Sequence, residues 1–127
     1  MRESHDQPAH SVKAGAVVSK AALRAAEQLG VSAKSLAATI GVSEATVSRM
    51  RRDEFELQPG TKPFELAVLF VRMFRSLDAI GGGEERVAQR WLVAQNEALG
   101  GVPAELMLTV AGLVNVISYL DARRALV

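Results

Sequence analysis

The chain has 127 residues, of which 49% are hydrophobic and 23% are charged, and its net charge is +1. This hydrophobic content excludes a largely disordered protein, and the length allows one moderate core or two small ones. The chain has no cysteine, which excludes a disulfide framework and a thiolate metal site. Its N-terminus lacks the apolar core of a signal peptide, and no apolar run approaches the roughly 20 residues of a membrane helix. We therefore expect a soluble, cytoplasmic protein.

Residues 1–10 combine charge, two histidines and a proline with almost nothing to bury, which predicts a flexible tail. His5, Asp6 and His10 raise the alternative of a metal site, but no further ligands follow nearby, so we favour a solvated tail and expect no metal. Over residues 11–29 the apolar spacing predicts a helix that ends at Gly30, with Gly15 as a weak point near its start.

Residues 31–52 predict two short helices joined by a tight turn. Ser32 and Ser43 are suitable N-caps, because their hydroxyls can accept hydrogen bonds from free backbone amides, and Gly41 can adopt the left-handed conformation that ends the first helix. The apolar residues predicted to face inward are Leu36, Ala37 and Ile40 in the first helix, and Ala45, Val47 and Met50 in the second. This arrangement is typical of a helix-turn-helix, the alternative being an ordinary helical hairpin with a solvated basic end.

The remaining positions of the second helix carry groups that can reach base edges and phosphates. The predicted DNA-binding residues are Ser43, Glu44, Thr46, Ser48, Arg49, Arg51 and Arg52. Residues 7–52 carry seven basic and two acidic side chains, whereas residues 53–127 carry seven basic and ten acidic ones. A basic half beside an acidic half is expected when one end neutralises phosphates. The segment resembles the Cro/repressor-type, or Xre-type, helix-turn-helix.

The pair Pro59 and Gly60 marks the end of this first unit, and Thr61 can cap a new helix with Pro63 in its first turn. This helix is apolar on nearly every side, which is difficult to bury within a small chain. We therefore predict a homodimer whose interface includes Phe64, Leu69, Phe70, Met73 and Phe74. Ordinary core packing of the same residues is the equal alternative.

Residues 78–83 end that helix, and Glu84 and Glu85 open the next. Its apolar face is predicted to be Val87, Ala88, Trp91 and Leu92. Gly100 and Gly101 predict a corner, Pro103 begins a short helix, and residues 109–112 predict a second break. A last helix from Leu113 to about Leu126 would complete an all-α protein.

The C-terminal half is similar to the toxin-binding domain of the MbcA/ParS/Xre antitoxin family. The matching residues are Trp91, Leu92, Asn96, Ala98, Leu99, Gly100, Gly101, Pro103, Glu105, Leu106, Thr109, Gly112, Val116 and Leu120. The sequence departs from the family at residues 95–97, where a proline often lies beside the asparagine, and in its short end after Leu120. The resemblance covers the chain from about Val12 onward. Together with the composition of the tail and the turn at Pro59 and Gly60, it predicts a flexible tail at residues 1–10, a Cro/repressor-like helix-turn-helix bundle at 11–58, and a small helical domain for dimerisation and toxin binding at 61–127.

The resemblance further implies an antitoxin that neutralises a cognate toxin, often a RES-domain protein that degrades NAD, and that represses the shared operon at its operator DNA. We expect the toxin to be bound, and its active site blocked, by the C-terminal end: Leu120, Asp121, Arg123, Arg124, Leu126 and Val127. In the alternative interpretation this end frays in solvent and its arginines only complement the helix dipole.

Two other functions are the alternatives to an antitoxin. A stand-alone dimeric helix-turn-helix repressor without a toxin partner would have much the same sequence. An enzyme is disfavoured, because both histidines lie in the tail and neither a phosphate-binding glycine loop nor a nucleophile elbow is present. We expect no cofactor.

Overall fold

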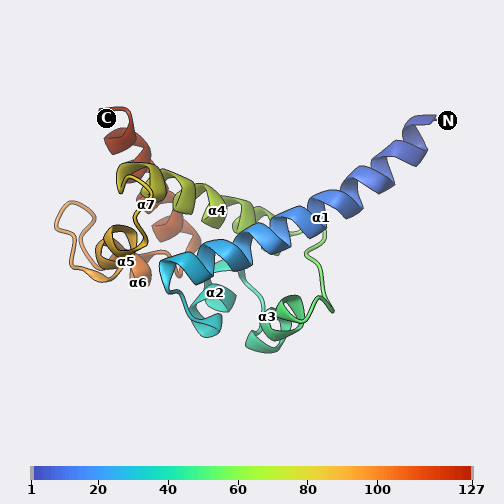
Figure 1. Ribbon diagram of the computed structural model, residues 1–127, viewed down its shortest axis with the longest axis horizontal. Coiled ribbons are helices and arrows are strands. Elements are labelled where there is room, and N and C mark those ends of the chain that lie inside the picture. The colour runs from blue at the N-terminus through green and yellow to red at the C-terminus, as the bar shows by residue number, and fades with distance from the viewer. Residues whose placement is uncertain (1, 127) are drawn as a thin grey trace.

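The computed structural model describes the backbone of residues 2–126 and the side chains of residues 13–126. Within this part of the chain the secondary structure is entirely helical, as predicted. The seven helices are α1 Arg2–Leu29, α2 Ala33–Ile40, α3 Glu44–Arg51, α4 Lys62–Ile80, α5 Glu85–Val93, α6 Pro103–Leu106 and α7 Val110–Arg124. In Figure 1, α1 runs along the molecule with α2 and α3 on one side of it, while α5, α6 and α7 gather towards its C-terminal end.

Helix α1 begins at Arg2, so the backbone of residues 2–10 is helical where the sequence predicted a tail. A helix nucleated by the buried residues that follow can propagate outward at little cost, since each added residue gains a hydrogen bond. Figure 1 shows these first turns projecting beyond the rest of the molecule. The side chains of the predicted metal alternative, His5, Asp6 and His10, lie outside the described residues.

Gly15 is a packing position, where the sequence indicated only a weak point in the helix. A Cβ at Gly15 would lie 2.5 Å from the carbonyl oxygen of Leu57, too close for any side chain. One turn further along, the backbone N–H of Leu57 donates a 2.9 Å hydrogen bond to Oγ of the buried Ser19. Together these contacts hold the segment between α3 and α4 against α1.

Helix α4 lies at the centre of the fold, in contact with α1, α2, α5 and α7. Its buried side chains join one continuous core that includes residues from both predicted units. Phe70 and Met73 are both 0% exposed, and the other three residues of the predicted dimer interface, Phe64, Leu69 and Phe74, are half-buried against the same core. Neighbours in the same chain thus cover much of α4, as in the alternative of ordinary core packing, while Val68 of the same helix is 42% exposed. The homodimer stays a prediction.

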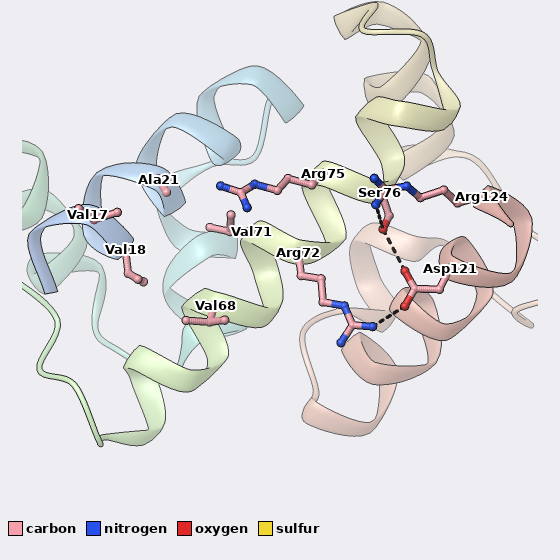
Figure 2. A pocket seen from close by; sticks show the side chains of 10 residues that line it. All are labelled: Val17, Val18, Ala21, Val68, Val71, Arg72, Arg75, Ser76, Asp121 and Arg124. Carbon is pink, nitrogen blue, oxygen red and sulfur yellow. Dashed lines mark hydrogen bonds and ion pairs between the residues drawn. The ribbon is translucent and has the colours of Figure 1, made fainter. Parts of the chain in front are cut away.

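Helix α7 is tied to α4 through Asp121, as Figure 2 shows. Nη2 of Arg72 donates a 2.6 Å hydrogen bond to Oδ2 of Asp121, and Oγ of Ser76 donates one of 3.0 Å to Oδ1. Ser76 is completely buried, and its Oγ also accepts a 3.4 Å hydrogen bond from Nη1 of Arg124. This network fixes the last turns of α7 on the middle of α4.

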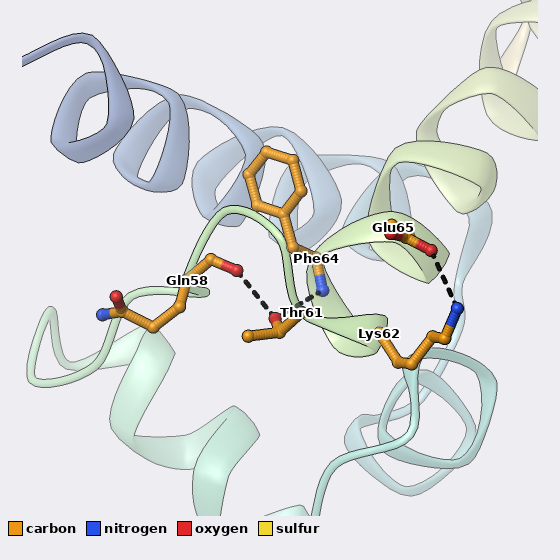
Figure 3. Close-up of polar contacts among 5 residues, drawn as sticks. All are labelled: Gln58, Thr61, Lys62, Phe64 and Glu65. Atoms are coloured by element: carbon orange, nitrogen blue, oxygen red, sulfur yellow. Dashed lines mark hydrogen bonds and ion pairs between the residues drawn. The ribbon is translucent and has the colours of Figure 1, made fainter. Parts of the chain in front are cut away.

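The start of α4 is defined by the predicted N-cap. Oγ1 of Thr61 accepts a 3.4 Å hydrogen bond from the backbone N–H of Phe64 and donates one of 2.7 Å to the carbonyl of Gln58 (Figure 3). The exposed pair of Lys62 and Glu65, 3.4 Å apart, adds a contact within the first turn. Thr61 thus joins the turn at residues 58–60 to the helix.

The corner before α6 is organised by Asn96. Its side-chain Oδ1 accepts a 3.0 Å hydrogen bond from the N–H of Leu99, and its backbone N–H donates one of 2.9 Å to the carbonyl of Gly101. Gly100 takes the left-handed conformation within this turn, with φ of 78°. The asparagine therefore closes the corner without the proline that often lies beside it.

The predicted break over residues 109–112 is wrong in extent. Helix α7 begins at Val110, and Thr109 caps it by accepting a 3.0 Å hydrogen bond from the N–H of Gly112. Gly112 lies inside the helix, where any Cβ would collide with the carbonyl oxygen of Leu106. Glycine is needed there because α7 approaches α6 closely. In the sequence alone, the same glycine indicates a break in the helix.

Candidate functional site

Helices α2 and α3 form the helix-turn-helix that the sequence predicted. Oγ of Ser32 accepts a 3.1 Å hydrogen bond from the N–H of Ser35, and Oγ of Ser43 accepts one of 3.0 Å from that of Thr46. Gly41 ends α2 with φ of 78°, and its N–H donates to the carbonyl of Ala37. Both N-caps and the left-handed glycine are confirmed, so local chemistry sets the angle at which α3 leaves the turn.

One face of α3 packs inward and the other is open to solvent. Thr46, Val47 and Met50 are buried. The exposed residues are Ser43, Glu44, Ala45, Ser48, Arg49, Arg51 and Arg52. Two predicted orientations are thus corrected: Ala45 faces solvent, because it lies nearly opposite Val47 on the helix, and Thr46 faces inward, one turn before Met50.

Arg49 is held in place by two neighbours. Oγ1 of Thr46 accepts a 3.2 Å hydrogen bond from Nη2 of Arg49 and shares one of 2.9 Å with Oγ of Ser43. The guanidinium carbon of Arg49 also lies 5.8 Å from the ring centroid of Phe55. Phe55 could not be predicted from the sequence, because the residues around it do not indicate that the segment after α3 folds back under Arg49.

Two neighbouring arginines, Arg51 in the last turn of α3 and Arg52 at its C-cap, differ from Arg49. Nε of Arg52 pairs with Oε1 of Glu54 at 3.1 Å, which neutralises part of its charge. Asp53, between them, adopts the left-handed conformation with φ of 62° as the chain leaves α3. Arg51 is exposed and lines a groove with residues of α1.

The predicted toxin-contact residues divide into an anchored part and an exposed part. Leu120 is only 1% exposed and belongs to the core, which corrects its prediction as a surface contact. The carboxylate of Asp121 is already engaged by Arg72 and Ser76. Leu120 faces inward because it continues the buried stripe of Leu113, Val116 and Ile117 along α7.

Beyond Asp121 the chain end is open to solvent. Arg123 and Arg124 are exposed, Leu126 is 84% exposed, and Val127 lies outside the described residues. Nη1 of Arg123 donates a 3.2 Å hydrogen bond to the hydroxyl of Tyr119 and its guanidinium lies over the Tyr119 ring. That ring stacks on Trp91 of α5 with centroids 6.1 Å apart, so Arg123 is connected to α5 through Tyr119.

The helix-turn-helix with its exposed basic face defines a DNA-binding protein that carries a second, C-terminal helical domain. Residues 8–72 match the model of the antitoxin Xre-like helix-turn-helix domain, and residues 76–125 match that of the antitoxin Xre/MbcA/ParS C-terminal toxin-binding domain. The chain therefore belongs to the Xre/MbcA/ParS family of antitoxins. A comparison with curated proteins finds no significant match.

Neither matched domain family is enzymatic. Among the described residues there is no group of three or more histidine, aspartate or glutamate side chains that could hold a metal ion. In the same part of the chain no helix is both long enough and apolar enough to cross a membrane. The candidate sites are the outer face of α3 and the exposed end of α7, where the exposed residues predicted for DNA and toxin contact lie.

Proposed function

We propose that this antitoxin neutralises a RES-domain toxin that degrades NAD, by placing the end of α7 in the toxin's active site, and that it represses its own operon through α3. Both activities belong in the cytoplasm, where NAD and operator DNA are found. DNA binding is assigned to residues 11–58 and toxin binding to residues 61–127, while the boundary between the matched family domains falls within α4.

The main support for toxin binding is that the end of α7 has two parts, one bonded to α4 and one exposed to solvent. Asp121 is fixed to Arg72 and Ser76, and directly beyond it Arg123, Arg124 and Leu126 are exposed. A rigid helix that ends in an exposed cationic and apolar tip can enter a concave site at little cost in conformational entropy, because its last turns are already ordered. The arginines can pair there with acidic groups of the toxin.

The proposed DNA contact rests on the exposed side of α3. Ser48 and Arg49 lie on that side and carry hydrogen-bonding groups suited to base edges in the major groove. Because Thr46 and Phe55 hold Arg49, its guanidinium is ordered before DNA arrives, which lowers the entropy lost on binding.

The experiment that tests this function uses the product of the gene adjacent to the one for this chain. Expressed alone, that product should stop growth and lower cellular NAD; co-expressed with this chain, it should do neither and should co-purify with it. If the neighbouring product co-purifies but leaves NAD unchanged, the RES assignment is wrong. If no stoichiometric partner is recovered and the chain still represses its promoter, it is the stand-alone repressor.

A further inference from the structure

Helices α1 and α3 enclose a groove of about 610 Å³ with an excess of positive charge. Its walls are Lys20, Leu23, Arg24 and Glu27 of α1 and Arg51 of α3. Three cations face one carboxylate, and the side chains of Lys20, Arg24 and Arg51 are all exposed. The family match assigns the chain a helix-turn-helix domain without assigning any DNA contact to α1.

The basic side chains of α1 continue beyond the groove along a single face. Lys13 is seven residues before Lys20, and Arg24 is four residues after it, so all three lie within a narrow angular range. The stripe from Lys13 to Arg24 is about 16 Å long at the rise of an α-helix. Over that length one DNA strand presents several phosphates.

The ion pairs among the described side chains do not involve the cations of this stripe. The pairs formed are those of Arg52 with Glu54, Lys62 with Glu65, and Arg72 with Asp121. Arg51 contributes the nearest cation of α3 itself, in the last turn of that helix. Lys20 and Arg24 of the stripe share the groove with Arg51, so the stripe reaches the C-terminal end of the helix proposed to enter the major groove.

We propose that Lys13, Lys20 and Arg24 of α1, together with Arg51 of α3, form a surface that binds the DNA backbone beside the groove that α3 enters. The ligand is the phosphate chain of duplex DNA, which the stripe matches in charge and in length. Because phosphates carry no sequence information, this surface adds affinity to operator and unrelated DNA alike. Glu27 opposes the same contact, since its carboxylate faces the groove.

The test is the salt dependence of binding by the full chain to a mixed-sequence DNA duplex of about 30 base pairs. Each phosphate contact contributes about 0.9 to the slope of log K against log salt concentration. Arg24→Gln should lower that slope by about 0.9, and Lys20→Gln should do the same. Glu27→Gln should instead strengthen binding. The matched control is Arg75→Gln, which removes an exposed arginine of α4, and it should leave the slope unchanged.

The inference rests on DNA binding through α3, so the same variants are also measured on a fragment of the chain's own promoter. The specificity ratio between promoter and mixed DNA should stay the same in Arg24→Gln and fall in Arg49→Ala. An Arg24→Gln slope no lower than that of Arg75→Gln overturns the backbone surface while leaving the role of α3 intact. A loss of specificity in Arg24→Gln overturns it as well, since Arg24 would then contact bases. If the unaltered chain binds neither DNA, both the backbone-binding surface and DNA binding through α3 are rejected.

Discussion

At the scale of single residues, Arg49 is the side chain on which sequence reading by α3 depends. It is exposed, yet Thr46 and Phe55 hold its guanidinium in one place. We expect Arg49→Ala to weaken promoter binding by about 1 to 3 kcal/mol, the usual contribution of an arginine contact to a base. The measurement is a titration of the promoter fragment at fixed salt, with circular dichroism to establish that the fold is intact.

The control for this prediction is Ser118→Ala, which alters an exposed residue of α7 in the other domain. Promoter affinity should be unchanged in that protein. Affinity that is equally unchanged in a folded Arg49→Ala protein would reject α3 as the sequence reader.

Gly112 is a second residue whose identity has a steric cause. Any Cβ there would overlap the carbonyl oxygen of Leu106, which is backbone and cannot move independently. We expect Gly112→Ala to destabilise the fold by about 1 to 3 kcal/mol or more, as overpacking does. Urea unfolding of the two proteins measures this change.

Gly101→Ala is the matched comparison for that measurement. Its Cβ would meet only the end of the Leu106 side chain, at 3.2 Å, and that side chain can shift. The loss of stability should therefore be clearly smaller than for Gly112→Ala. Helix propensity and the unfolded state both favour alanine over glycine inside a helix, so they cannot account for a loss at position 112. Equal losses in the two variants would therefore contradict a special steric role for Gly112 in the close approach of α7 to α6.

At the scale of whole helices, Asp121 determines how firmly α7 lies on α4. Asp121→Asn removes the charge that pairs with Arg72, and the pair is partly exposed, with side-chain exposures of 59% and 35%. We therefore expect a modest loss, about 1 kcal/mol in the free energy of unfolding. Toxin binding should weaken with it, because the end of α7 is no longer held in one orientation.

The distinguishing control is Arg72→Gln, which removes the same ion pair from the α4 side. Since Arg72 lies outside the proposed contact, both variants should lose toxin affinity to a similar extent. If only Asp121→Asn weakens the complex, Asp121 contacts the toxin directly and its anchoring role is secondary.

Helix boundaries set by local chemistry could be predicted from the sequence. Ser32, Ser43 and Thr61 each cap a helix through their own hydroxyl, and Gly41 ends one through its own backbone, so a short pattern contains the information. Boundaries set by distant contacts could not. The start of α7 was misplaced because the glycine at position 112 serves packing against α6, which no local pattern reveals.

The same division applies to the candidate site. The outward position of Arg49 follows from helical periodicity, whereas its contact with Phe55 depends on the path of the segment after α3. Leu120 was placed on the toxin surface because it precedes a charged end, although its spacing from Leu113 and Val116 already matches the buried face of α7.

At the scale of the whole molecule, the single core limits where two copies can meet. Phe70 lies at the centre of that core with 0% exposure. Phe70→Ala should therefore cost about 3 to 5 kcal/mol and unfold the monomer, without selectively separating a dimer. Thermal unfolding at two protein concentrations distinguishes these outcomes, because dissociation of a dimer would make the midpoint depend on concentration.

Two copies are still expected on DNA, because helix-turn-helix proteins of this kind bind paired half-sites. Sedimentation of the chain with its promoter fragment should give two protein chains per duplex. A single chain per duplex, at saturating protein concentration, would rule out the homodimer. The buried residues of α4 would then form only the core of one chain, with no role in a dimer interface.

If the exposed end of α7 neutralises the toxin, as we propose, a truncation after Ala122 should show it most directly. This cut removes Arg123, Arg124 and Leu126, and with Arg124 its 3.4 Å hydrogen bond to Ser76. It keeps the contacts of Asp121 with Arg72 and Ser76 and the buried residues of α7, so the fold of α4 and α7 should persist. Co-expressed with its toxin, the truncated chain should fail to restore growth and should not co-purify, while its promoter affinity stays as in the full chain. Full protection of cells by a truncated chain that still co-purifies with the toxin would contradict the account.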